Sequence, residues 1–129
     1  MIDVSPVIKD KIEGALYAYF YNITEPIDVG GNIYHIDHQV GTRPLAWVRK
    51  MLLLDADAHT KDQWLQIVNQ VFSNCGDEAL QKYIMRRYGL REAAEDTCFE
   101  LLFERSAYYR YRTALIYGIA IKAAAVGLL

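Results

Sequence analysis

The sequence predicts an all-α, multi-helix fold for a single domain of residues 1–129, and three observations lead to this class. Apolar residues recur at steps of three and four, as on one face of a helix, through most of the chain. Residues that break helices gather in one stretch, 23–41. A chain of 129 residues, 53% of them hydrophobic, is long enough to bury one core and too short for two ordinary ones.

Residues 1–22 are expected to form an N-terminal helix, whose apolar pattern runs over 7–21. Ser5 is available as its N-cap. Pro6 suits the first helical position, because the amide hydrogen that proline lacks would have no partner there. The residues that follow the amphipathic spacing are Ile8, Ile12, Ala15, Leu16, Tyr19 and Phe20.

Residues 23–41 are expected to form one long glycine-containing loop, with a short extended piece at 33–36. His35, Asp37 and His38 are a usable set of metal ligands. Because no further ligand follows at a regular spacing, we interpret them as a polar turn and predict no metal site. The residues that break the helical pattern are Pro26, Gly30, Gly31, Asn32 and Gly41.

Residues 42–76 are expected to form the central helices. The first begins near Pro44 and carries a wide apolar stripe of leucine, tryptophan and methionine. The second begins with a capping box of Thr60 and Gln63 and continues to Phe72.

Residues 77–129 are predicted to contain a helix-turn-helix. Asp77 caps a helix that ends at Gly89, a short helix follows over 91–101, and a long helix begins at Arg105. Phe103 is expected to fill the corner between the last two. This succession is the layout of proteins that read the DNA major groove.

The last helix is expected to bury one side and expose an Arg-rich side. Arginine can grip guanine through two parallel hydrogen bonds, and hydroxyl groups reach phosphates or base edges. We therefore predict that Arg105, Ser106 and Tyr109 contact base edges. The residues predicted to lie nearer the phosphates are Arg110, Arg112, Thr113, Arg86 and Arg87. The side expected to face the core carries Tyr108, Tyr111, Leu115, Ile119 and Lys122.

The charge distribution bears on this prediction in two ways. A net charge of -2 argues against a general nucleic-acid coat, which would be strongly basic. Residues 1–78 contain six Lys and Arg against eleven Asp and Glu, whereas residues 79–129 contain eight against five. The basic surplus therefore lies in the half with the predicted helix-turn-helix. An Arg-rich face is most often only a solvated surface, so a helical protein-interaction module with little or no DNA binding is the alternative.

The C-terminal third, from Leu80 to Ala120, resembles the C-terminal helix-turn-helix of the RinA-type phage transcriptional regulators. The resemblance implies a domain similar to region 4 of the sigma factors, double-stranded DNA as partner, and activation of late or packaging genes in phages of Gram-positive bacteria. The features that match are an aromatic-ended helix at 82–88, a short helix containing Cys98, the corner residue Phe103, the basic helix from Arg105 and the glycine pair Gly30-Gly31.

Two differences from the family bear on the assembly. The chain has Glu104 at the corner, where the family favours a small hydroxyl-bearing residue. It also has fewer cations along the last helix, which predicts that binding needs a second copy and therefore a homodimer. The apolar segments 123–129 and 47–54 are candidate dimer faces, with ordinary core as the alternative for both and as the favoured interpretation of 47–54. The acidic N-terminal part is expected to be available to host RNA polymerase. The positions that lack the expected Lys or Arg are Ala114, Tyr117 and Gly118.

Other functional classes have little support in the sequence. Cys75 and Cys98 lie far apart without CxxC spacing, which indicates reduced thiols in a cytoplasmic protein. The resemblance to phage regulators implies that this is the cytoplasm of a bacterial host. The apolar stretch 114–129 contains Lys122 and two glycines, so a buried helix end is expected and not a membrane span. No nucleophile motif or phosphate-binding glycine loop occurs, so neither an enzyme nor a cofactor is predicted.

Overall fold

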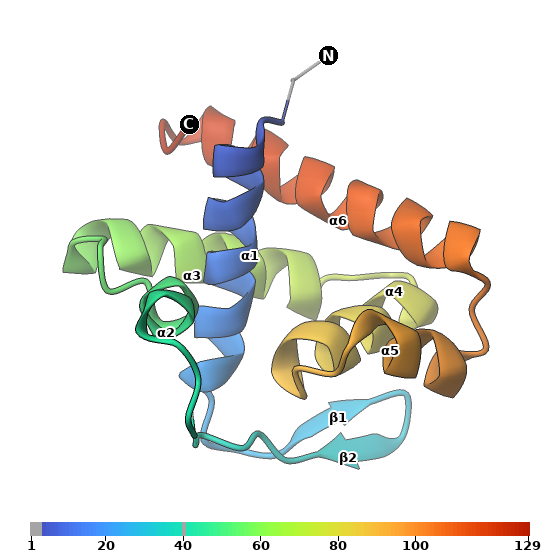
Figure 1. Cartoon of the computed structure of the whole chain (residues 1–129). Helices are drawn as coiled ribbons and strands as arrows, with labels where there is room; N and C mark the ends of the chain where they lie inside the picture. The colour runs from blue at the N-terminus through green and yellow to red at the C-terminus, as the bar shows by residue number, and fades with distance from the viewer. Residues whose placement is uncertain (1–3, 40) are drawn as a thin grey trace.

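The computed structural model describes residues 4–39 and 41–129 and is mostly helical (Figure 1). Within these residues it contains six α-helices, one π-helical segment and a two-stranded hairpin, which agrees with the all-α prediction everywhere but at the hairpin. In chain order the elements are α1 (Pro6–Tyr21), β1 (Ile27–Val29), β2 (Asn32–Tyr34), α2 (Leu45–Leu52), α3 (Ala58–Ser73), α4 (Glu78–Ile84), η1 (Met85–Gly89), α5 (Ala94–Leu101) and α6 (Arg105–Ala125).

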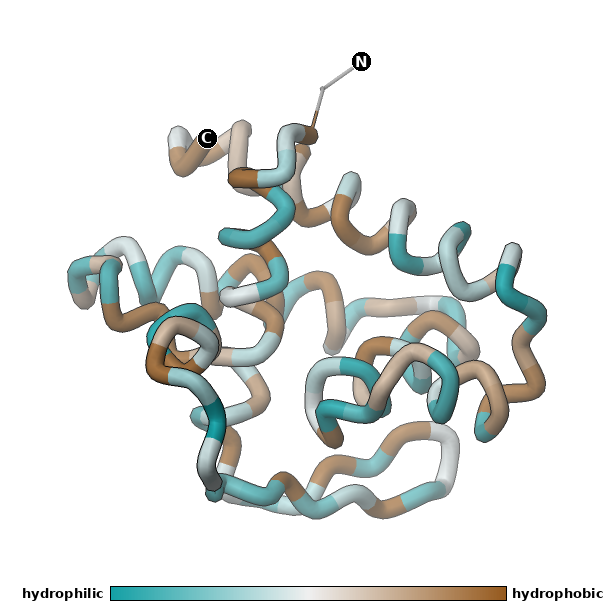
Figure 2. Tube along the Cα trace, viewed as in Figure 1, coloured by the Kyte–Doolittle hydropathy of each residue, from teal (hydrophilic) through white to brown (hydrophobic). Residues whose placement is uncertain are grey.

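Helix α1 lies at the centre of the fold, with α2, α3, α6 and η1 packed around it (Figure 1). Its start follows the prediction: the Ser5 side chain accepts a hydrogen bond from the backbone N–H of Ile8 at 3.3 Å, and Pro6 lies in the first turn. Hydrophobic and hydrophilic residues are interspersed along the helices, as expected for elements with one buried side (Figure 2). Residues of α1, α3, α4, η1 and α6 share one core cluster.

The expected glycine-containing loop is not irregular throughout, because it contains the antiparallel hairpin of β1 and β2. Their pairing begins at Ile27 and Tyr34. Gly30 and Gly31 connect the strands with φ of 59° and 85°. Two residues in this left-handed conformation form the tight turn that matches the twist of paired strands, and glycine adopts it without strain. The extended piece expected at 33–36 is borne out only for residues 33 and 34, because β2 starts at Asn32 and ends at Tyr34.

Helix α2 lies directly against α1 at Gly14. A Cβ atom at this position would come within 2.8 Å of the backbone oxygen of Lys50, so only glycine allows the two backbones to approach this closely. The helix ends at Leu52, because Leu53 has a φ of 51° and leaves the helical conformation.

Helix α3 begins at Ala58, earlier than predicted. Its N-cap is Asp57, whose carboxylate accepts a hydrogen bond from the backbone N–H of Thr60 at 2.8 Å. This hydrogen bond lowers the pKa of the Asp57 carboxyl group. The predicted capping box of Thr60 and Gln63 is therefore wrong, since a carboxylate that bonds the free N–H groups starts the helix before it.

The C-terminal elements follow the predicted order with shifted boundaries. Asp77 caps α4 as expected, and the helix continues as the π-helical segment η1 to Gly89. Helix α5 begins three residues later than predicted, because Arg91 has a left-handed φ of 59°. The corner of residues 102–104 then leads into α6, and Leu102 in this corner has a φ of 56°.

Helix α6 lies on the outside of the molecule and packs against α1, α3 and α5 (Figure 1). Phe103 at the corner stacks on Tyr111 with 4.9 Å between the ring centroids, as the prediction of a corner plug requires. Lys122, expected on the inner side, is exposed. None of the described helices has the length and apolar character needed to cross a membrane. The buried residues of α6 are Tyr108, Leu115, Ile116, Ile119, Ala120 and Ala123.

Candidate nucleic-acid interface

The exposed side of the N-terminal half of α6 brings together five of the eight side chains predicted to contact DNA. All five are exposed to solvent, and their spacing places them on one side of the helix. This α6 outer strip consists of Arg105, Ser106, Tyr109, Arg110 and Thr113.

The two arginines of the strip are available for an external anion. Within residues 4–39 and 41–129, neither Arg105 nor Arg110 forms a salt bridge. The Arg105 guanidinium group lies 5.8 Å from the centroid of the Tyr109 ring. Hydrogen bonding to the Tyr109 side chain raises the pKa of Arg105, so the group carries its positive charge at any physiological pH.

Two other predicted arginines form ion pairs inside the fold. Arg112 Nη2 lies 3.1 Å from Glu13 Oε1, with side chains 31% and 12% exposed. Arg86 Nη1 lies 3.2 Å from Glu92 Oε1, and a longer contact of 3.9 Å joins Arg86 to Glu100. These charges are neutralised locally, so the structure does not bring Arg86 or Arg112 into the strip.

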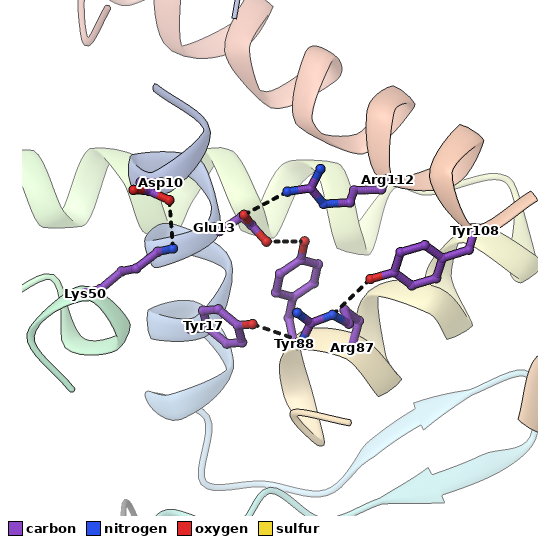
Figure 3. A network of polar contacts seen from close by, with 8 residues as sticks. All are labelled: Asp10, Glu13, Tyr17, Lys50, Arg87, Tyr88, Tyr108 and Arg112. Atoms are coloured by element: carbon purple, nitrogen blue, oxygen red, sulfur yellow. Dashed lines mark hydrogen bonds and ion pairs between the residues drawn. The ribbon is translucent and has the colours of Figure 1, made fainter. Parts of the chain in front are cut away.

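Arg87 is partly buried, and three oxygen atoms hold its guanidinium group. Its Nε donates to the Tyr108 hydroxyl at 3.1 Å, and its Nη1 donates to the Tyr17 hydroxyl at 3.0 Å (Figure 3). Nη1 also donates to the backbone oxygen of Glu92 at 3.2 Å. Although burial opposes the charged form, attraction from the surrounding tyrosine oxygens raises the pKa of Arg87. Arg87 therefore connects α1, η1 and α6.

Glu13 forms the second half of the same polar network. One carboxylate oxygen pairs with Arg112, and the other accepts a hydrogen bond from the Tyr88 hydroxyl at 3.1 Å (Figure 3). Burial is the main cause that raises the pKa of Tyr88, so its hydroxyl remains a hydrogen-bond donor. We call Glu13, Tyr17, Arg87, Tyr88 and Arg112, together with Tyr108, the interhelical clamp.

The sequence analysis missed the interhelical clamp, although one signal for it is present. Glu13 lies three residues before Leu16 and seven before Phe20, which puts a carboxylate on the buried side of an amphipathic helix. A charge at such a position needs a partner of opposite charge. Spacing alone does not identify this partner, since Arg112 lies 99 residues away in the chain.

The surface of α5 has the opposite charge from the α6 outer strip. Residues 93–104 include four carboxylates and no Lys or Arg. Arg105, the first residue of α6, is thus the boundary between an acidic and a cationic surface. A polyanion such as DNA is attracted to the α6 side of this boundary and repelled from the α5 side.

Two of the three side chains that were considered as metal ligands, Asp37 and His38, form local hydrogen bonds. His38 Nε2 lies 2.6 Å from the backbone oxygen of Ile23, and Asp37 Oδ1 accepts a hydrogen bond from the backbone N–H of Gln39. Across the described part of the chain, no group of three His, Cys, Asp or Glu side chains is placed to hold a metal ion. The chain matches no protein-family model, no curated protein and no solved structure in the three comparisons.

Proposed function

We propose that this protein is a phage or prophage transcription regulator that binds double-stranded DNA through the α6 outer strip. One observation carries the proposal: a three-residue corner leads into a long helix whose first turns expose Arg105, Ser106 and Tyr109. In helix-turn-helix proteins, the N-terminal residues of the second helix contact base edges in the major groove. The resemblance to the RinA-type regulators supports the same assignment and adds activation of late or packaging genes.

Each side chain of the strip matches a chemical group of the duplex. Arg105 can donate two parallel hydrogen bonds to O6 and N7 of a guanine. The hydroxyls of Ser106 and Tyr109 can bond a base edge or a phosphate oxygen. Arg110 and Thr113, which lie further along the helix, suit the phosphates beside the groove.

The interhelical clamp supports a positioning role for the remaining arginines. Arg87 and Arg112 hold α6 against α1 and η1 through hydrogen bonds of 3.0 to 3.1 Å. A reading helix that is already fixed in the free protein loses little conformational entropy on binding. We therefore assign Arg87 and Arg112 to the orientation of α6 and not to phosphate contact.

The charge of the strip supports a homodimer as the DNA-binding form. If Arg110 neutralises one phosphate while Arg105 contacts a base edge, one chain displaces about one counterion, which gives log K against log salt a slope of roughly −1. A homodimer doubles the number of phosphate contacts and brings the slope to about −2. Two cations on a chain of net charge -2 give weak binding to any one half-site, so specific affinity requires both subunits.

The test is a fluorescence anisotropy titration of DNA from upstream of the protein's own gene at two salt concentrations. We expect submicromolar, salt-sensitive binding that Arg105→Ala and Arg110→Ala each weaken by about tenfold or more. Lys122→Ala is the matched control, because it removes an exposed cation from the far end of the same helix. Its affinity should stay within about twofold of the unmodified protein.

Two results would contradict the proposal. The first is binding that Arg105→Ala and Arg110→Ala leave unchanged, since the strip would then not be the contact surface. The second is the absence of salt-sensitive binding to both this DNA and a random-sequence duplex pool. The second result would favour the alternative of a helical protein-interaction module.

A further inference from the structure

We infer that the end of α5 and the following corner form a docking surface for a cationic amphipathic segment of a partner protein. This α5 corner patch consists of Glu95, Asp96, Phe99, Leu102 and Glu104. It lies beside the α6 outer strip and shares no residue with it. The inference goes beyond DNA binding and does not depend on it.

The apolar part of the patch is exposed to an unusual degree. Phe99 is 79% exposed and Leu102 is 91% exposed, and these are the highest values among the exposed large hydrophobic side chains of the described chain. Phe99 lies in the last turn of α5, and Leu102 directly follows the end of this helix. A single exposed apolar residue needs no explanation, but two large ones this close in the chain indicate a contact surface.

Leu102 adds an independent argument. Its φ of 56° is a left-handed conformation, which disfavours any residue with a Cβ and which glycine adopts freely. Its side chain is almost fully exposed, so it contributes little packing within the fold. Packing within the fold therefore gives no reason for a large apolar side chain at this position, whereas a contact outside the fold would give one.

The carboxylates of the patch favour a positively charged partner. Within the described residues, Glu95, Asp96 and Glu104 form no salt bridge. The neighbouring cation is Arg105, which interacts electrostatically with Glu95, so three carboxylates share one positive charge and the patch stays net negative. Lys and Arg side chains around an apolar contact would neutralise these carboxylates. A nucleic acid or an anionic lipid surface would instead meet like charge, as would the same patch on a second copy.

The order of apolar and acidic residues in the patch suits a helix in the partner. An amphipathic helix presents apolar residues at steps of three and four, flanked by polar residues, and it can lay this face on an exposed apolar surface. Phe99 and Leu102 provide the apolar contact, with Asp96 and Glu104 near its two ends along the chain. The occupant is thus a cationic amphipathic helix.

The inference is tested with a fluorescein-labelled 18-residue helical peptide made of leucine and lysine, and with its leucine and glutamate counterpart. The full chain should bind the lysine peptide and not the glutamate peptide in an anisotropy titration. Phe99→Ser should weaken binding by about tenfold, as expected for a central apolar contact residue. The double variant Glu95→Gln with Asp96→Asn should weaken it severalfold and reduce its dependence on salt.

The control variant changes one exposed apolar and one exposed acidic side chain outside the α5 corner patch. Leu45 is 67% exposed at the start of α2 and Glu25 is exposed beside the hairpin, so Leu45→Ser with Glu25→Gln should leave peptide binding unchanged. Circular dichroism should give the same helical content for all variants, because Phe99 makes few internal contacts. DNA affinity should not change in Phe99→Ser, and Arg110→Ala should not affect the peptide, so the two proposals fail separately.

Three outcomes would overturn the inference. One is equal binding of the lysine and glutamate peptides. Another is binding of the lysine peptide that Phe99→Ser does not weaken, which would place the peptide elsewhere. The third is sedimentation of the unmodified chain as a dimer that Phe99→Ser dissociates, because the occupant would then be a second copy.

Discussion

Three residues other than glycine have a left-handed backbone conformation in the described chain, and each follows a helical segment. Leu53 ends α2, Arg91 follows η1, and Leu102 ends α5. A helix often ends in this conformation, and glycine is its usual occupant because glycine has no Cβ. Without a glycine at position 91, the start of α5 was predicted three residues too early.

The corner residue gives the first prediction. Leu102→Gly should raise the free energy of unfolding by up to about 1 kcal/mol, because relief of roughly 1 to 2 kcal/mol of backbone strain exceeds the extra chain entropy of glycine. Little packing is lost, since the side chain is 91% exposed. Urea unfolding followed by circular dichroism measures the difference. Leu102→Ala is the control, because it removes the side chain and keeps the strain, and a loss of stability in Leu102→Gly would contradict the argument.

The helices could be predicted from the sequence to the extent that their signals are local. The caps at Ser5 and Asp77 and the amphipathic spacing of α1 depend on residues at most four apart, and each was predicted. The hairpin pairs two segments of only three residues, which are too short for an alternating pattern. The interhelical clamp depends on contacts between Glu13 and residues 75 and 99 positions later, which no local pattern indicates.

For the candidate site, too, some features follow from local sequence patterns and others depend on contacts between distant residues. Exposure of Arg105, Ser106, Tyr109, Arg110 and Thr113 follows from the position of the buried side of α6, which periodicity predicts. Whether an arginine on the helix surface is free depends on what lies opposite. Arg112 faces a carboxylate of α1, so only the tertiary arrangement reveals that its charge is already paired.

The close contact between α1 and α2 at Gly14 predicts that a larger residue there will disturb the packing of the two helices. Gly14→Ala should lower the free energy of unfolding by roughly 1 to 2 kcal/mol, because overpacking against the Lys50 backbone exceeds the gain in helix propensity. Trp47 of α2 lies 5.4 Å from the Tyr17 ring, so a displacement of α2 should also shift the tryptophan emission.

The matched control is Gly118→Ala in α6. A Cβ at position 118 meets nothing within 4 Å, so this change should raise stability by up to about 1 kcal/mol through helix propensity alone. Equal gains in the two variants would mean that α2 yields to the new methyl group without strain.

In the whole molecule, helix α1 joins the N-terminal and C-terminal halves of the chain. This helix contacts α2 and α3 of the N-terminal half of the chain and η1 and α6 of the C-terminal half. Its Glu13 is the polar link to Tyr88 and Arg112. A single domain stays a prediction, and the reason to expect it is that neither half can unfold without exposing the buried face of α1.

Both tryptophans, Trp47 and Trp64, lie in the N-terminal half, and this allows the single domain to be tested. In urea, tryptophan emission follows that half, whereas far-ultraviolet circular dichroism follows all helices. The two transitions should coincide in the unmodified protein, because α1 couples the halves. Glu13→Gln should lower the free energy of unfolding by about 1 to 3 kcal/mol by leaving Arg112 without its charged partner, and its two transitions should still coincide. Separate midpoints for the two signals in the unmodified protein would mean that the C-terminal elements form a second cooperative unit, and that the interhelical clamp does not join it to the rest.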